Sequence, residues 1–216
     1  MKKNKTILSF DLDFTLIDNK KGIINSFKYA LKKYSLPELS TSEIEKTIGM
    51  PLNDVFTRFS GINPLILTTA FREYYSSEGI YQVKLIPGVK NKLKELRKSF
   101  ILGVITSKKE ELAVKLLKYL KIDNYFDYIL GENENRKRKT DPKLKDYLLK
   151  KYLNCNIIVI GDHPKDRELA EMLNCPFIGV LTGFHNSKQL IPNDNSNMLI
   201  LKSVNDITID LINSLF

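Results

Sequence analysis

Residues 7–15, ILSFDLDFT, decide the fold of this chain. An apolar, partly β-branched run, typical of a buried strand, stops at two carboxylates, Asp11 and Asp13, and a threonine, Thr15. Burying an unpaired carboxylate is costly, so two acids at the end of an apolar strand indicate a site. Side chains at i and i+2 of an extended segment point the same way. Asp11 and Asp13 can therefore converge on one bound phosphate and one metal ion.

The second half of the chain alternates short apolar runs with helical periodicity. Residues 100–106 (FILGVIT) and 157–160 (IIVI) are typical of buried strands, and further strands are expected at 128–130, 177–181 and 198–201. Strands separated by helices of about ten residues predict βαβ units, an α/β fold and a mainly parallel sheet. The apolar residues with helical spacing that lie between these strands are Val89, Leu93, Leu96, Leu112, Leu116, Leu120, Leu144, Leu148, Leu169 and Leu173.

Residues 18–85 interrupt this alternation. They carry helical periodicity without a convincing strand, and turn signals occur at Pro37, Gly49 and Gly61. We therefore predict a small all-helical unit over residues 18–85, inserted after the first strand of a core made of residues 1–17 and 86–216.

Four polar segments each follow a predicted strand. The carboxyl ends of parallel strands meet at one edge of the sheet, so we expect these segments to lie together. Carboxylates, hydroxyls and an ammonium group at one edge suit Mg²⁺-dependent phosphoryl transfer, because Mg²⁺ prefers oxygen ligands and a lysine neutralises phosphoryl oxygens. The segments are Asp11 to Thr15, Thr106-Ser107, Lys139 to Pro142, and Gly161 to Asp166.

The composition is that of a globular protein without a membrane span. Of the 216 residues 43% are hydrophobic and 27% charged, and no run approaches the ~20 apolar residues of a spanning helix. The basic N-terminus lacks a secretory cleavage site, and the two cysteines, Cys155 and Cys175, form no disulfide framework, which favours the cytoplasm. The net charge of +9 is spread over the helical segments, so we expect no nucleic-acid partner.

The four segments, in this order, resemble the motifs of the haloacid dehalogenase superfamily of aspartyl-phosphate hydrolases, and the resemblance covers essentially the whole chain. It implies a Rossmann-like parallel sheet with helices on both faces and a small helical cap. The third motif is the loosest, because Thr140 replaces its usual first proline; Lys137 and Lys143 remain alternatives to Lys139. Phe14 stands at a position that is commonly glycine in the first motif.

The resemblance implies a role for each matching residue. Asp11 would be the nucleophile and Asp13 the general acid and base, and Lys139 would pair with the nucleophile and the phosphoryl group. Thr106, with Ser107 beside it, would bind phosphoryl oxygens. The metal residues would be Asp11, Asp13 through its backbone carbonyl, Asp162 and Asp166, with Asp166 acting through water or by positioning Lys139 instead. Thr15 would steady the loop.

The cap pattern resembles the phosphoglycolate-phosphatase-like branch, which implies a Mg²⁺-dependent phosphatase acting on a small phosphate monoester. Pyrophosphatases, nucleotidases and β-phosphoglucomutase-type phosphomutases share the motifs, and an inactive binding module is a further alternative. A halide-removing dehalogenase would need neither Asp13 nor the Gly161-Asp162 corner. The sequence leaves the oligomeric state open. His163 and His185 are expected to be loop residues without an assigned role.

Overall fold

The computed structural model describes residues 5–136, 138–193 and 196–216, and its chain divides into two compact units. One unit holds residues up to Ile17 and from Leu85 onward, and the other holds Asp18–Lys84. The predicted boundary at 85/86 lies one residue beyond this division. We call the two parts the core unit and the cap unit.

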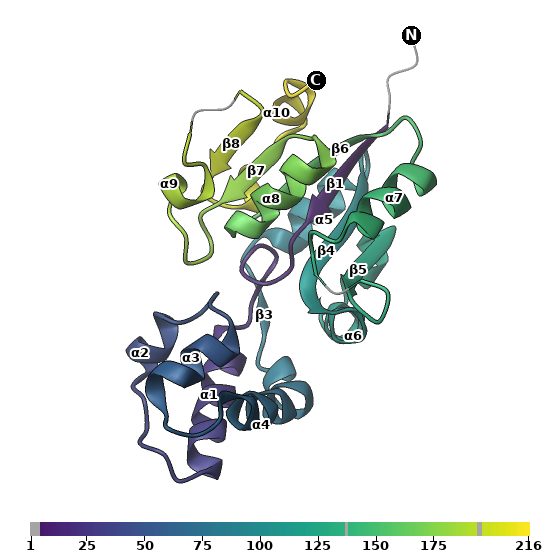
Figure 1. Ribbon diagram of the computed structural model, residues 1–216. Coiled ribbons are helices and arrows are strands. Elements are labelled where there is room, and N and C mark those ends of the chain that lie inside the picture. Colours follow the sequence, from purple (N-terminus) through teal and green to yellow (C-terminus); the bar gives the residue numbers. More distant parts are fainter. Residues whose placement is uncertain (1–4, 137, 194–195) are drawn as a thin grey trace. The chain divides into compact units, whose positions relative to one another are not determined.

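The core unit contains a parallel sheet of six strands in the order β5-β4-β1-β6-β7-β8 (Figure 1). Each neighbouring pair in this sheet is parallel, and Ile7 of β1 lies between Ile101 of β4 and Ile157 of β6. The predicted α/β fold is thereby confirmed. The strands are β1 Thr6–Phe10, β4 Ile101–Lys109, β5 Tyr128–Glu132, β6 Asn156–Gly161, β7 Phe177–Val180 and β8 Met198–Leu201.

Helices cover both faces of this sheet. Leu144 and Leu148 of α7 and Leu169 of α8 join a buried cluster on one face, together with Ile7 and Phe177. Helix α5 lies behind the sheet in the view of Figure 1. The helices of the core unit are α5 Val89–Leu96, α6 Glu110–Tyr119, α7 Pro142–Lys151, α8 Pro164–Leu173, α9 Ser187–Leu190 and α10 Ile209–Asn213, with short 3₁₀ turns at Asp123–Tyr125 and Val204–Asp206.

The cap unit is a small helical bundle built on aromatic packing. Phe27 contacts Phe56 and Phe71 at ring-centroid distances of 5.1 and 4.9 Å. The backbone comes close at Gly22, where a Cβ would lie 2.2 Å from the carbonyl oxygen of Gly79. The helices are α1 Lys20–Lys33, α2 Thr41–Glu45, α3 Leu52–Phe59 and α4 Pro64–Ser77, followed by a 3₁₀ turn at Gly79–Tyr81.

Two short strands pair where the chain passes from one unit to the other. They are β2, Ile17–Asp18, and β3, Lys84–Leu85. The sequence pattern did not predict them, because two-residue strands carry no periodic signal.

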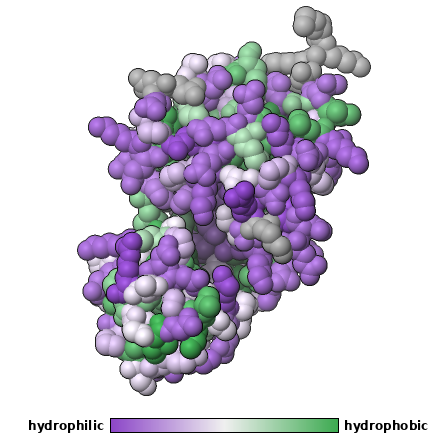
Figure 2. Space-filling view, viewed as in Figure 1, coloured by the Kyte–Doolittle hydropathy of each residue, from purple (hydrophilic) through white to green (hydrophobic). Residues whose placement is uncertain are grey.

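The surface is mainly hydrophilic on the face seen in Figure 2, and hydrophobic side chains gather on the visible part of the cap unit. Exposed apolar residues of that unit include Phe59, Leu65 and Ile66. Within the described residues, no helix has the length and apolar character needed to cross a membrane.

Candidate active site

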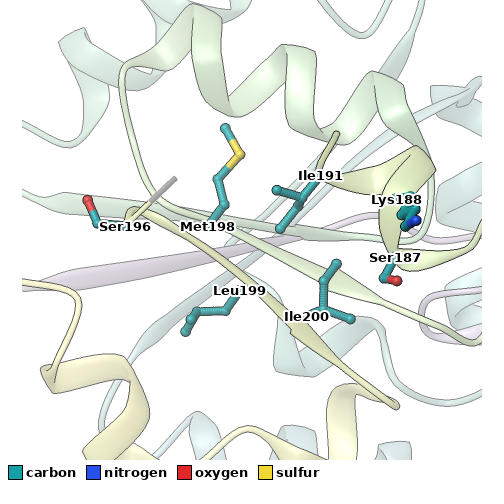
Figure 3. Close-up of a pocket in the computed structure, with 7 residues that line it drawn as sticks. All are labelled: Ser187, Lys188, Ile191, Ser196, Met198, Leu199 and Ile200. Carbon is teal, nitrogen blue, oxygen red and sulfur yellow. The ribbon is translucent and has the colours of Figure 1, made fainter. Parts of the chain in front are cut away.

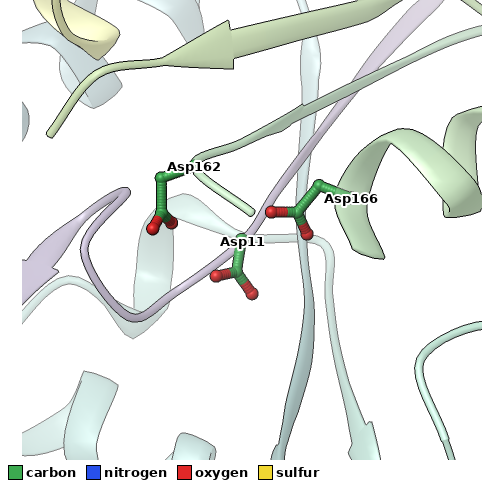
Figure 4. Close-up of side chains that lie close together, drawn as sticks. All are labelled: Asp11, Asp162 and Asp166. Carbon is green, nitrogen blue, oxygen red and sulfur yellow. The ribbon is translucent and has the colours of Figure 1, made fainter. Parts of the chain in front are cut away.

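Three carboxylates meet at the carboxyl ends of β1 and β6, the two central strands. Asp11 follows β1, Asp162 follows β6, and Asp166 lies in the first turn of α8 (Figure 4). One oxygen from each lies within 4.8 Å of the others. In the sheet order, β1 has β4 on one side and β6 on the other, which is where the connections change direction and where open α/β folds bind ligands.

A tight loop after β1 presents the two acids of the first motif. Within it Leu16 and Ile17 donate backbone hydrogen bonds to the carbonyl of Leu12, at 3.0 and 3.2 Å. The turn needs a left-handed residue, and Phe14 takes that conformation with φ of 58°. Phe14 is held there by an edge-to-face contact with Phe184 and by a hydrogen bond from Thr182 Oγ1 to its carbonyl. The sequence did not show that this position requires a positive φ.

Lys139 reaches the acidic cluster from the loop before α7. Its Nζ lies 2.6 Å from Asp11 Oδ1 and also forms an ion pair with Asp166, and the residue is 5% exposed. Lys143, an alternative from the sequence, is exposed, and Lys137 lies outside the described residues. The structure therefore brings Lys139, and not Lys143, to Asp11.

The loop that carries Lys139 is anchored to α6. Arg136 forms an ion pair with Glu110 at the start of that helix, and Glu110 also accepts a hydrogen bond from the backbone N–H of Gly131 at 3.2 Å. The guanidinium of Arg136 is largely buried against Glu110.

Asp162 and Asp166 are held by polar groups that fix their orientation. Thr15 Oγ1 donates a hydrogen bond of 2.8 Å to Asp162 Oδ1, so this threonine, expected to steady the loop, also orients a carboxylate. Asp166 Oδ2 accepts from the backbone N–H of His163 at 3.0 Å, while its other oxygen faces Lys139. This geometry favours the alternative in which Asp166 positions Lys139.

The charges at the site are unbalanced. Burial, opposed by the Lys139 ammonium, raises the pKa of Asp11 to about 7. Burial also raises the pKa of Asp162 well above its usual value, and the charges of Asp11 and Asp166 add to this. Burial alone would lower the pKa of Lys139, but the neighbouring Asp11 and Asp166 raise it above its ordinary value. Lys139 is therefore a permanent cation, but its single positive charge does not balance the carboxylates around it.

The second motif differs from its prediction. Strand β4 continues to Lys109 instead of ending at Thr106, with an irregularity in its pairing between Ile105 and Lys109. Thr106 is 2% exposed and Ser107 is exposed. Lys108, which the sequence reasoning missed, places its Nζ 3.1 Å from Asp13 Oδ2. The alternation of an extended strand, which sends Thr106 and Lys108 to the same side, could have revealed it.

The two histidines lie beside the acidic cluster. His163 was expected in an exposed loop, but it is partly buried and caps α8, its Nδ1 accepting from the backbone N–H of Lys165 at 3.1 Å. The ring of His185 packs edge to face on that of His163 at 4.5 Å. Burial lowers the pKa of His163 to about 4, so this ring is neutral at physiological pH.

A depression of about 620 Å³, away from the acidic cluster, lies beside the edge strand β8 (Figure 3). Met198 and Ile200 project from one face of the strand and Leu199 from the other. Among the described residues that line it there is no acid, and Lys188 is the charged one. The described part of this lining therefore lacks the carboxylates that phosphoryl transfer requires.

Comparison with known proteins decides the family. The family model described as "Haloacid dehalogenase-like hydrolase" matches residues 8–180, which include Asp11, Thr106, Lys139 and Asp162. The chain belongs to the haloacid dehalogenase-like hydrolases. The family match confirms the predicted superfamily, and with relatives that are named phosphatases it also confirms the prediction that this haloacid dehalogenase-like hydrolase is a phosphatase-type enzyme.

Individual relatives agree with this assignment. PpaX of Caldanaerobacter subterraneus subsp. tengcongensis, provisionally named a pyrophosphatase, is 34% identical over 164 residues, 74% of each chain. A phosphoglycolate phosphatase of Vibrio cholerae is 25% identical and covers 87% of this chain and 89% of its own. The structure of a haloacid dehalogenase-like hydrolase from Streptococcus pneumoniae superposes with a TM-score of 0.83 at 26% identity, over 98% of this chain and 99% of that one.

Proposed function

We propose that this hydrolase releases phosphate from a small phosphate monoester through a covalent aspartyl phosphate on Asp11, and that it depends on Mg²⁺. The observation that carries this proposal is the contact of Lys139 with both Asp11 and Asp166, beside Asp162, at the ends of the central strands. A buried nucleophile next to a permanent cation is suited to attack an anionic phosphoryl group.

The donor set fits a divalent cation. Asp11, Asp13, Asp162 and Asp166 bring four carboxylates, against the two ammonium groups of Lys108 and Lys139. Carboxylates therefore outnumber ammonium groups at the site, which suits a divalent cation, and oxygen ligands suit Mg²⁺. Asp11 and Asp162 would hold it, assisted by the carbonyl of Asp13, while Asp166 would position Lys139. When bound, the ion would offset charge on the phosphoryl oxygens.

Each residue of the site would then have a separate role in the reaction. A carboxylate oxygen of Asp11 forms a bond to phosphorus as the ester P–O bond breaks, and Asp13 gives a proton to the departing oxygen. Asp13 next takes a proton from the water that attacks the aspartyl phosphate, which returns Asp11 and releases phosphate. Lys139 keeps Asp11 in place, and Thr106 binds a phosphoryl oxygen.

The substrate we favour is phosphoglycolate-like. The phosphoglycolate phosphatase and pyrophosphatase names among the relatives support a phosphate compound whose leaving group is small and anionic. Pyrophosphate and nucleoside monophosphates are the alternative substrates. The alternative activity is that of a phosphomutase acting on a sugar phosphate.

Phosphate release tests the proposal. The enzyme is incubated with 2-phosphoglycolate, pyrophosphate, a nucleoside monophosphate and β-glucose 1-phosphate, each with Mg²⁺ or with EDTA. We expect Mg²⁺-dependent release from one favoured compound, and none from the Asp11→Asn variant. Glucose 6-phosphate as the main product would favour the mutase. A folded enzyme that releases phosphate from no compound would overturn the proposal in favour of a binding module.

A further inference from the structure

Lys108 occupies an unusual position in strand β4. The pairing of β4 with β5 is irregular between Ile105 and Lys109, so this end of the strand departs from the regular ladder. The backbone N–H of Lys108 donates to Thr106 Oγ1 at 3.2 Å. Its carbonyl packs against β5 so closely that a Cβ on Gly131 would lie 2.5 Å from it. Lys108 is therefore fixed at the edge of the site by its backbone.

The side chain of Lys108 is directed into the site. It is 9% exposed, although a lysine normally keeps its ammonium group in water. Its Nζ lies 3.1 Å from Asp13 Oδ2, whereas Lys139 contacts Asp11 and Asp166. Lys139 thus contacts the proposed nucleophile, and Lys108 contacts the acid that we expect to protonate the leaving group.

This division has a consequence for the substrate. To take a proton from Asp13 Oδ2, the departing oxygen must lie within about 3 Å of that atom. Because Lys108 Nζ lies 3.1 Å from the same Oδ2, the ammonium is then within about 6 Å of the departing oxygen. An anionic group one or two atoms from the ester oxygen falls in this range. The carboxylate of 2-phosphoglycolate and the second phosphoryl group of pyrophosphate both meet the requirement.

We propose that Lys108 binds a second anionic group, carried by the leaving group, and so selects esters with an anionic leaving group over neutral ones. This inference rests on the proposed function and deepens it by naming the substrate class. If Lys108 served only as a counter-ion that positions Asp13, its loss would affect all esters alike.

The test compares two esters that differ in one group. Ethyl phosphate carries a methyl group where 2-phosphoglycolate carries its carboxylate. We expect Lys108→Met to lower the ratio of kcat/KM for 2-phosphoglycolate to that for ethyl phosphate by roughly 10- to 100-fold, because a charge-assisted hydrogen bond is lost. Lys109→Met, which removes an exposed neighbouring lysine, should leave this ratio unchanged.

Calorimetry separates this inference from the proposed function. With the Asp11→Asn variant and Mg²⁺, we expect Lys108→Met to weaken binding of 2-phosphoglycolate but not of ethyl phosphate. Equal losses for both esters, or no loss for either, would overturn the role of Lys108. Absence of phosphate release by the wild-type enzyme from both esters would count against the proposed function, and the binding comparison would still decide the role of Lys108.

Discussion

Two glycines determine how closely the backbone approaches the acidic cluster. A Cβ on Gly161 would lie 2.1 Å from Asp166 Oδ2, and a Cβ on Gly183 would lie 1.9 Å from Asp162 Oδ2. Both distances are far below van der Waals contact, so a larger residue forces the carboxylate to move. Because Thr15 holds the other oxygen of Asp162, that carboxylate cannot turn aside without breaking a hydrogen bond.

We therefore expect Gly183→Ala to impair the metal site more than the fold. The displaced Asp162 should raise the Mg²⁺ concentration for half-maximal activity by roughly 10- to 100-fold, as loss of groups that orient metal ligands does. Gly61→Ala is the control, because nothing lies within 4 Å of its Cβ. An unchanged Mg²⁺ requirement in Gly183→Ala would contradict the proposal that Asp162 binds the metal.

The thiol of Cys175 provides a prediction about pH. Burial raises its pKa to about 12, so the folded protein keeps this thiol protonated well above the ordinary value of 9.0. The folded state then holds a proton that the unfolded chain loses, and this contribution to stability declines as the pH rises from 9 towards 12. At pH 8.5 we expect iodoacetamide to alkylate Cys175 at least about 100-fold more slowly in the folded protein than in urea, because the thiolate is the nucleophile. Rates within tenfold, measured by peptide mass spectrometry, would contradict the burial of this sulfur.

Residue types at strand ends were sufficient to predict Asp11, Asp162 and Asp166 as neighbours, since parallel strands bring their ends together. They could not distinguish which lysine of a basic loop reaches the cluster, because that depends on anchoring by Glu110. Lys108 was missed because the strand was expected to stop at Thr106, and the assigned catalytic roles remain predictions.

At the scale of elements, strands β4 and β5 pack through one tight pair. Gly103 of β4 lies opposite Tyr128 of β5, and a Cβ on Gly103 would lie 2.0 Å from the tyrosine ring. The Tyr128 hydroxyl hydrogen-bonds Ser9 of β1 at 2.5 Å, so the ring extends across β4 to the central strand. Tyr128 is 5% exposed and cannot move away without breaking this bond.

Gly103→Ala should therefore destabilise the core unit by roughly 1–3 kcal/mol, the usual cost of overpacking. Urea unfolding of this variant beside Gly61→Ala provides the measurement. A midpoint equal to that of Gly61→Ala would show that the strands can separate at this pair without cost.

The elements of the core unit were predictable because apolar runs and helical spacing alternate along the chain. The ends of these elements were less predictable. Strand β4 extends three residues beyond its apolar run, because Ser107, Lys108 and Lys109 are polar and carry no apolar signal. Helix α9 was not predicted, because its four residues are too few to show a period.

At the scale of the whole molecule, the excess of buried carboxylates should make stability depend on a cation. We expect saturating Mg²⁺ to raise the melting temperature by roughly 5–10 °C over that in EDTA, as binding to the folded state at 100 times Kd contributes about 2.7 kcal/mol. Asp162→Asn should lose most of this shift. A wild-type melting temperature that is the same in Mg²⁺ and EDTA would contradict a metal site at this cluster.

The family and the sheet were predictable at this scale because four motifs occur in a fixed order. The physiological substrate was not, since the shared motifs do not include the residues, such as Lys108, that we propose contact the leaving group. The cytoplasmic location stays a prediction.

Trapping the phosphoryl group on Asp11 tests the central claim most directly. The enzyme would be mixed with its favoured ester and Mg²⁺, quenched in acid and reduced with borohydride, which converts an aspartyl phosphate to homoserine. We expect peptide mass spectrometry to find homoserine at position 11 in the wild-type enzyme and not in Asp11→Asn. Turnover of the ester with homoserine at another aspartate, and aspartate intact at position 11, would contradict the account.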